Sequence, residues 1–461
     1  MTAVHATRSL CPLIRRGQCG QALVLALVVL FGGLLGLFFL FSTGQVIAAK
    51  QRLVHAADAA AWSSALWRAR VFNFQAYANR AIVAQEVAVA QAVTLVSWAK
   101  YFEQFTANAS VLATAWPPAA PVLEAAASVA QGARELTELT AAQEIPVRAA
   151  PSIGYKSLLA RSQEVLELAA GSFGLGAVAN EIVRASDRRF FAFALGDGGA
   201  FSAFSRRYES DEDRARLRDV VTDSLDGFVR GPRKDNLQLL LLPSSCFGRT
   251  TNVDQWFRSW RKRGGTDLAP DLERWQAVDT ASIHNWRRRG LLRRSCRRQE
   301  WLPTGWGAAQ ASDGSFADGI VGDPGSTRDN PGATALAETG ITGAGHAGFG
   351  QYSGIERVRE LNYEALADDR FPVSQVVILA RQEARDVRTA NALDVGTGRL
   401  RLFEAFAGQR LWAMAVGEAY FRRPPAAPAR IEYASLYSPY WQARLAAPTE
   451  AQRVAAEAYA Y

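Results

Sequence analysis

Basic and aromatic residues are concentrated between residues 249 and 298, which carry thirteen Lys and Arg against five Asp and Glu. This excess equals the net charge of +8 of the whole chain, so the remaining residues are neutral in sum. Four tryptophans are interleaved with the charges: Trp256, Trp260, Trp275 and Trp286. This pattern is typical of surfaces that bind single-stranded nucleic acid, acidic glycans or anionic lipid head groups. Because the arginines occur in scattered pairs without a repeat, we expect instead a solvated face whose aromatic side chains point into the core.

Other motifs that could carry chemistry are incomplete. Ser244, Ser245 and Cys246 lack a Gly-x-Ser-x-Gly context and a neighbouring base. Residues 313–317 (DGSFA) are similar to the Asp-x-Ser-x-Ser metal loop of von Willebrand A domains, but Ala317 replaces an oxygen ligand. Residues 343–348 (GAGHAG) have dinucleotide-binding glycine spacing without a preceding strand. With His284 and His346 as lone histidines, we expect no metal, no cofactor and no enzymatic activity.

Cysteine usage leaves one question open. Cys11 and Cys19 precede a long apolar run, so Cys246 and Cys296 are the only pair in the main body of the chain. In an oxidising compartment these two could form a disulfide, and the alternative is two free thiols, since no spacing rule ties them.

The element that positions this body is an apolar run from Ala22 to Phe41, twenty residues without a charged or polar side chain. At about 1.5 Å per residue it spans the roughly 30 Å hydrocarbon core of a bilayer once. A cleaved signal peptide is the alternative, with a small-residue site at Val46 and Ala48, but signal apolar regions are usually only about 7–15 residues long. We therefore expect an uncleaved membrane anchor.

The charges beside the anchor predict its orientation. Arg8, Arg15 and Arg16 precede the span, whereas Lys50 and Arg52 follow it, which favours a cytoplasmic N-terminus and an exported body. Gly32 and Gly36 form a Gly-x-x-x-Gly pair that could allow a second membrane helix to approach closely, although glycine is common in such helices.

A long helix is expected to continue from the anchor, because residues 45–105 contain neither Pro nor Gly and are rich in Ala. Its apolar stripe includes Leu95, Trp98, Phe102 and Phe105, at spacings of three and four. We expect the stripe to pack on later helices of the same chain, with another subunit as the alternative. Asn73 and Asn79 lie where so long a helix could bend or fold back.

The remaining chain divides by composition. We expect a cytoplasmic arm at 1–21, the membrane helix at 22–41, a helical stalk at 42–116, an Ala-rich helical region at 117–195 and an exported body at 196–461. Within 158–183, glycines at 171, 174 and 176 weaken a helical pattern. Short apolar runs at 237–242 and 373–380 favour strands. Residues 305–354 contain 13 of the 37 glycines and are typical of loops and hairpins.

Several segments together resemble TadG-like pilus assembly proteins of the Flp, or tight adherence, system. The N-terminal resemblance covers residues 16–24 (RGQCGQALV), the apolar run and residues 53–61 (LVHAADAAA). Weaker similarity to longer members of this group occurs at 73–81 (NFQAYANRA), 87–91, 274–280, 305–307, 418–424 (EAYFRRP) and 436–445 (LYSPYWQARL).

The resemblance implies a membrane-anchored, exported, accessory or minor component of a pilus or secretion assembly, without enzymatic activity. Pilin processing normally leaves Glu at the fifth mature position, but cutting after Gly17 or Gly20 would leave Ala22 or Leu25 there. The implied partners are the lipid bilayer and other pilus or secretion subunits, with a homo-oligomer as a further option.

We expect an α+β chain in which one N-terminal transmembrane helix continues into a long Ala-rich helical region, followed by an exported body of mixed helices and strands. A tethered module that binds nucleic acid or acidic glycan through residues 249–298 is the alternative, and of these ligands nucleic acid is the less expected.

Overall fold

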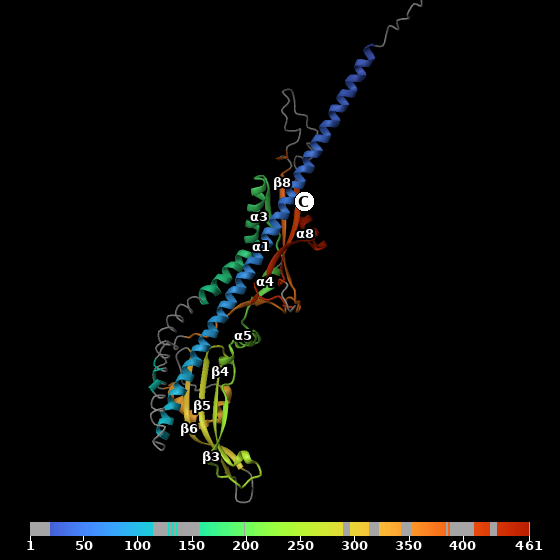
Figure 1. The fold of residues 1–461 in the computed structure, drawn as a ribbon. Coiled ribbons are helices and arrows are strands. Elements are labelled where there is room, and N and C mark those ends of the chain that lie inside the picture. Colours follow the sequence, from blue (N-terminus) through green and yellow to red (C-terminus); the bar gives the residue numbers. More distant parts are fainter. Residues whose placement is uncertain are drawn as a thin grey trace, which may run out of the picture.

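The computed structural model describes most of the chain after the first eighteen residues. The described residues are 19–113, 128–129, 131–132, 135, 156–197, 199–288, 296–312, 322–342, 352–383, 386–387, 410–424 and 431–460. They form one very long helix, α1 (Cys19–Ala113), along which shorter helices and antiparallel sheets are packed (Figure 1). The α+β class expected from the sequence is confirmed.

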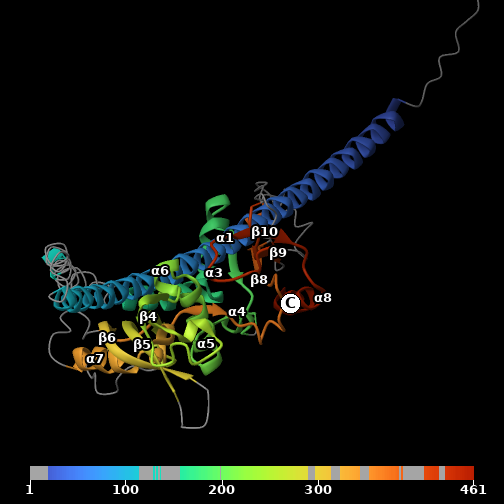
Figure 2. The same cartoon turned by 60° about the horizontal axis from the view of Figure 1, so that its bottom comes forward.

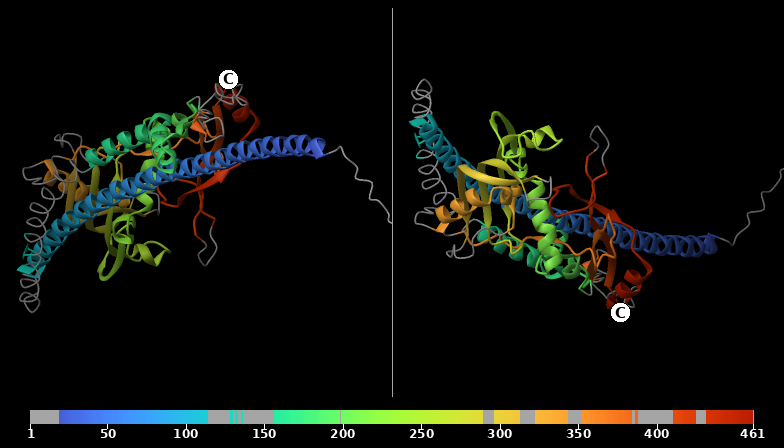
Figure 3. Two further views of the ribbon diagram at one scale, coloured as in Figure 1. Left: turned by 90° about the horizontal axis from the view of Figure 1, so that it is seen from above. Right: turned by 90° about the horizontal axis from the view of Figure 1, so that it is seen from below.

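Helix α1 is unbroken over 95 residues and only gently curved (Figure 3). The bend expected near Asn73 and Asn79 is absent, because both amides bind the body. The Asn73 amide donates to the Trp441 carbonyl (2.9 Å) and its oxygen accepts from the Trp441 N–H (3.0 Å). The Asn79 amide donates to the carbonyls of Arg359 and Leu436. The two side chains therefore fasten the continuous helix to the body.

The shorter helices surround α1 and the sheets. A helix at Lys156–Ala170 is followed by α3 (Ser172–Ser186), and the two axes differ by 60° at Gly171, where the glycines predicted a weak point. The other helices are α4 (Ala200–Phe204), α5 (Asp211–Asp223), α6 (Gly227–Arg230), η2 (Val253–Gln255), η3 (Pro324–Asp329), α7 (Pro331–Thr342) and α8 (Glu450–Ala460).

Two four-stranded antiparallel sheets lie at successive positions along α1. The proximal sheet, nearer the apolar end of α1, has the order β1 (Phe191–Ala194), β8 (Val373–Glu383), β9 (Arg410–Phe421), β10 (Trp441–Ala446). The distal sheet has the order β3 (Asp235–Pro243), β4 (Phe257–Leu268), β5 (Trp275–Arg288), β6 (Cys296–Ala311). Strands β2 (Ser205–Arg207) and β7 (Arg359–Leu361) form a small pair of their own.

The strands expected at 237–242 and 373–380 are confirmed as parts of β3 and β8. The loop-rich interpretation of 305–354 is wrong for two of its described segments, because β6 extends to Ala311 and α7 occupies Pro331–Thr342. The strand β1 also lies in the region that was expected to be helical.

Small residues allow α1 to lie directly on both sheets. A buried run of alanines, including Ala57, Ala60 and Ala61, faces β8, β9 and α3. A Cβ atom on Gly417 of β9 would lie 2.2 Å from the Ala61 carbonyl oxygen, and one on Gly307 of β6 would lie 2.3 Å from the Ser97 oxygen. No side chain fits at these two positions, so glycine there is what permits helix and strand to touch.

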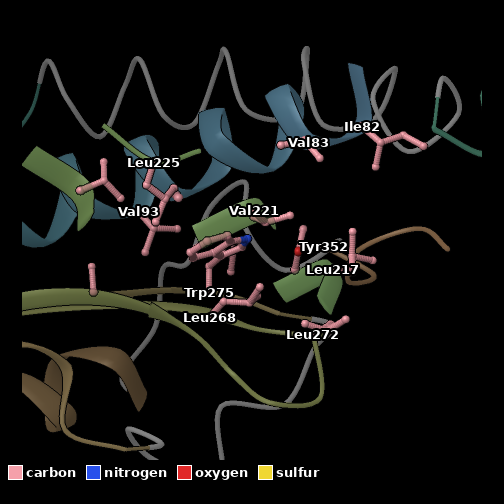
Figure 4. Packing of buried hydrophobic residues seen from close by; sticks show 14 of the residues in the cluster. Ile82, Val83, Val93, Leu217, Val221, Leu225, Leu268, Leu272, Trp275 and Tyr352 are labelled. Carbon is pink, nitrogen blue, oxygen red and sulfur yellow. The ribbon is translucent and has the colours of Figure 1, made fainter. Parts of the chain in front are cut away.

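The distal core is built around Trp275 of β5, which is fully buried against α1 and α5. Figure 4 shows Trp275 between Val93 of α1 and Val221 and Leu217 of α5, with Leu268 of β4 beside it. Burying an aromatic side chain of this size removes about 150–250 Å² from water. The distal sheet, α1 and α5 are therefore held as one unit.

A ladder of polar contacts joins α1 to the antiparallel helix Lys156–Ala170. Its α1 members are Arg68, Gln75, Asn79 and Glu86, at spacings of seven, four and seven residues. They contact, in order, the Ala170 carbonyl, the Glu167 carboxylate (2.8 Å), the Gln163 amide (2.8 Å) and the Lys156 ammonium (2.6 Å). The spacing keeps all four on one face of α1, so a single polar seam fixes the register of the two helices.

Candidate functional site: the anchor helix and the basic end of the distal sheet

The apolar part of α1 extends alone beyond the body (Figure 2). Among the described residues α1 is the one helix that is by itself long and apolar enough to cross a membrane, and its most apolar window has no buried residue. Its exposed side chains include Leu23, Phe31 and Leu40. Exposed apolar side chains all around a helix are what a lipid environment accommodates, so this segment has the surface as well as the length of a candidate membrane span.

Gly32 and Gly36 lie on this exposed part of α1. A Cβ atom added at either position would meet nothing within 4 Å. The face that carries them therefore has no partner within the described chain, and packing against a second membrane helix stays a prediction.

The transition from anchor to body is abrupt. Ser42, directly after the apolar run, is buried, as are Ala49 and Leu53. Lys50 donates from its ammonium group to the carbonyl of Trp412 on β9. Burial thus begins within the turns that follow the apolar run, the proximal core cluster starts at Leu53, and α1 is unbroken between them.

The predicted stripe on the distal part of α1 is only partly buried. Leu95 is 48% exposed, while Trp98 and Phe102 are half-buried and stack on each other at 5.3 Å between ring centroids. Phe105 packs against Trp260 of β4 at 5.8 Å. The fully buried face is instead formed by Val93, Ser97 and Tyr101 and their neighbours. Phe105 thus joins α1 to the distal sheet, and whether Leu95, Trp98 and Phe102 contact a second protein stays a prediction.

Cys246 and Cys296 form a disulfide bond in the structure, with their Cα atoms 6.5 Å apart. The bond joins the turn after β3 to the first residue of β6. In the same place the Asn285 oxygen accepts from the Ser245 N–H (3.2 Å). The loop between β3 and β4 is thereby tied across the ends of β5 and β6.

The basic segment 249–298 does not form one continuous face. Arg261, Arg263 and Arg298 surround Asp329, and Lys262 pairs with the buried Asp279. Burial lowers the pKa of Arg261, and Arg298 and Arg263 lower it further. Trp275 lies in the core. What remains open is the far end of β5 and β6, where Arg287, Arg288 and Arg297 are exposed and Trp286 is half-buried.

The described serine, cysteine and histidine residues considered as catalytic candidates are engaged in hydrogen bonds or in the disulfide. The Ser244 hydroxyl donates to the Gln255 carbonyl (2.5 Å), and the Cys246 thiol is consumed by the disulfide. His284 is buried, with Nε2 2.8 Å from the Asn330 oxygen. No group of three His, Cys, Asp or Glu that could hold a metal occurs within the described part of the chain. Residues 313–317 and 343–348, including His346, lie outside the described residues, as does Gly17.

Sequence reasoning missed the residues that position the body on the anchor helix. These are the members of the polar ladder, above all Glu86, which accepts from Lys156, from Trp275 Nε1 (3.1 Å) and from the Tyr352 hydroxyl (2.6 Å). The available signal was the recurrence of polar residues every four or seven positions in an otherwise apolar helix.

Residues 20–68 match the family model described as putative Flp pilus-assembly TadE/G-like. No curated protein and no solved structure matches the chain. The match covers the apolar run and the first buried turns of α1, so the resemblance inferred from the N-terminal residues is confirmed for this segment. It supports a role related to Flp/Tad pili.

Proposed function

We propose that this TadG-like chain is a membrane-anchored accessory or minor structural component of a Flp/Tad-type pilus or secretion assembly. The observation that carries the proposal is the continuity of α1, which runs without a break from the exposed apolar segment into the cores of both sheets. Any displacement of the membrane helix is therefore transmitted directly to the body. The role is mechanical and architectural, and no catalytic reaction is assigned.

The orientation belongs to the same proposal. We place the N-terminus in the cytoplasm and the body beyond the inner membrane, because the basic residues before the apolar run outnumber those just after it. The disulfide between Cys246 and Cys296 supports this arrangement, since disulfides persist in oxidising compartments.

The partners proposed are other subunits of the assembly, or a second copy of this chain, contacting the anchor within the membrane. The contact surface we propose is the face of Gly32 and Gly36, because it is exposed and small residues allow two helix backbones to approach closely. Bulky side chains at both positions would keep a neighbouring helix at a distance without changing the length of the anchor or adding a charge to it.

The test is cross-linking in membranes followed by purification of the chain with its partners. We expect Gly32→Leu with Gly36→Leu to remove cross-linked subunits of the assembly. The matched control, Ala26→Leu, adds bulk on a different face of the same helix and should retain them. If both variants retain the same partners as the natural chain, the anchor face does not mediate assembly and the proposed contact is wrong.

A further inference from the structure

The open end of the distal sheet forms a cleft of about 840 Å³ between the β5–β6 strand ends and the segment that joins η3 to α7. Five arginines line it, namely Arg287, Arg288, Arg297, Arg298 and Arg328. Trp286 is its aromatic lining residue, and Glu300 and Asp329 are its only lining carboxylates among the described residues. The cleft therefore carries an excess of positive charge.

Both carboxylates are already engaged by the protein. Asp329 lies within 4.0 Å of three arginines, of which only Arg298 belongs to the lining. Glu300 accepts from the Ser282 hydroxyl and from the backbone N–H groups of Gly332 and Ala333 at the start of α7. Neither carboxylate is left to neutralise the remaining arginines.

Arg287 and Arg297 are direct cross-strand partners in β5 and β6. Like charges directly opposite each other destabilise an antiparallel pair. Neither side chain has a carboxylate partner within the described part of the chain, and the same holds for the Arg328 guanidinium from η3. Three arginines from three elements thus face one cleft, and the described residues supply none of them with a counter-charge.

The buried floor of the cleft provides a second observation. His284 lines the cleft and is only 2% exposed, and its Nδ1 atom has no hydrogen-bond partner among the described residues. Burial lowers the pKa of His284, and the neighbouring Arg298 lowers it further. The positive charge of the cleft comes from its arginines, which keep it at any physiological pH.

We propose that this cleft binds a carboxylated or otherwise acidic polysaccharide. Guanidinium groups match carboxylates with paired hydrogen bonds, and Trp286 offers an apolar face for a sugar ring. The inference rests on the proposed function for the compartment, because a body outside the cytoplasm meets acidic glycans rather than the nucleic acid of its own cell. One lining aromatic residue also differs from the several stacking platforms that single-stranded nucleic acid binders use.

The location of the cleft separates it from the anchoring membrane. Asn108 of α1 contacts the Thr304 carbonyl of β6, and Arg297 and Arg298 of the cleft lie farther along β6. From Ser42 to Asn108, α1 rises by about 100 Å at about 1.5 Å per residue. Figure 1 shows the same arrangement, with the distal sheet at the end opposite to the apolar segment. The cleft is thus presented far from the anchoring bilayer.

The experiment measures binding of a fluorescent alginate oligosaccharide to the full-length chain in detergent. We expect Arg287→Gln with Arg297→Gln to weaken binding by about tenfold or more, because two charge-assisted contacts are lost. Arg328→Gln, from a different element, should weaken it by about threefold or more. The control Arg184→Gln with Arg188→Gln removes the same charge from exposed positions outside the cleft and should change binding by less than about twofold.

Absence of alginate binding, or equal weakening by the control pair, would overturn the proposal. Tighter binding of single-stranded DNA that depends on Arg287 and Arg297 would replace it with a nucleic-acid site. Because binding is measured on purified protein, it does not depend on export. A cytoplasmic signal from a reporter fused after Tyr461 would instead contradict the proposed orientation while leaving the binding result standing.

Discussion

The side chain of Glu86 connects four parts of the molecule. Its carboxylate binds Lys156 of the neighbouring helix, Trp275 of β5 and Tyr352 of the segment before β7. Glu86 and Lys156, the two charged residues, are both almost fully buried. A buried ion pair of this kind adds little net stability, but removal of one partner strands the other charge in the interior. Glu86 is therefore the residue at which a small change should have the largest effect.

We expect Glu86→Ala to lower the free energy of unfolding by about 3–5 kcal/mol, because Lys156 loses its buried counter-charge. Glu164→Ala is the control, since Glu164 pairs with Arg207 on the surface, where an ion pair is worth at most about 1 kcal/mol. Denaturant unfolding of the purified chain measures both changes. Equal losses for the two variants would contradict a special role for the buried pair.

The double variant Glu86→Gln with Lys156→Met provides a second check on this residue. It removes both charges and keeps an oxygen that can accept from Tyr352 and Trp275. We expect it to recover more than half of the stability that Glu86→Ala loses. A double variant no more stable than Glu86→Ala would show that the loss comes from packing rather than from an unpaired charge.

Glu360 of β7 should make stability depend on pH. Complete burial raises the pKa of its carboxyl to about 7, although the N–H groups of Leu361 and Leu436 and the Ser435 hydroxyl oppose the shift. In the unfolded chain the ordinary value is 4.5, so between these values the folded state holds a proton that the unfolded state has released. The free energy of unfolding should therefore fall as pH rises through this window.

Glu360→Gln tests this linkage, because an uncharged side chain of the same shape can accept the same backbone hydrogen bonds. We expect the natural chain to lose stability relative to the variant between about pH 4.5 and pH 7, in urea titrations at several pH values. All other titrating groups are the same in the two chains, so the difference between their stabilities reports on residue 360 alone. If the free energies of unfolding of the two chains changed in parallel with pH across this window, the Glu360 carboxyl would have the same pKa in the folded and the unfolded state.

At the scale of the elements, contact between α1 and the two sheets depends on small residues. We expect Gly307→Ala to destabilise the chain by several kcal/mol, because the new methyl group would overlap the backbone of Ser97 and Tyr101. Gly227→Ala, where an added Cβ meets nothing within 4 Å, should change stability by no more than about 1 kcal/mol. Thermal unfolding and protease cleavage within α1 measure the effect.

Equal stability of the two glycine variants would show that α1 is not seated closely on β6. A Gly307→Ala chain with an unchanged melting temperature but faster cleavage of α1 would mean something different: the contact exists, but the sheets fold without the helix.

The elements were predicted from the sequence to different degrees. Strands β3 and β8 were readable because their apolar runs are bounded by turn residues. Strand β6 was not, because Gly305 and Gly307 resemble loop residues until α1 is known to lie against them. The sequence also predicts possible bends at Asn73 and Asn79 rather than contacts with the body, because their partners are about 280 residues or more away along the chain.

At the scale of the whole molecule, the anchor was the most predictable feature. Twenty uncharged, apolar residues correspond to the thickness of a bilayer, so that inference needs no knowledge of tertiary contacts. The assembly of two sheets on one helix depends on strand pairing between distant segments, such as β1 with β8, which the sequence pattern does not encode locally. The basic cleft was visible only as a charged segment, because the structure decides which arginines already have carboxylate partners.

The central claim is that α1 is retained as one helix that joins a membrane anchor to the core of the body. The most direct test is the mature N-terminus of the protein in washed membranes, determined by mass spectrometry of the intact chain. We predict a chain that keeps residues 22–41 and stays in the membrane after an alkaline wash, with the cytoplasmic arm still attached. A mature chain that begins near Ala49 and is released by the wash would contradict the claim, because α1 would then end at the body and the apolar run would be a removed signal.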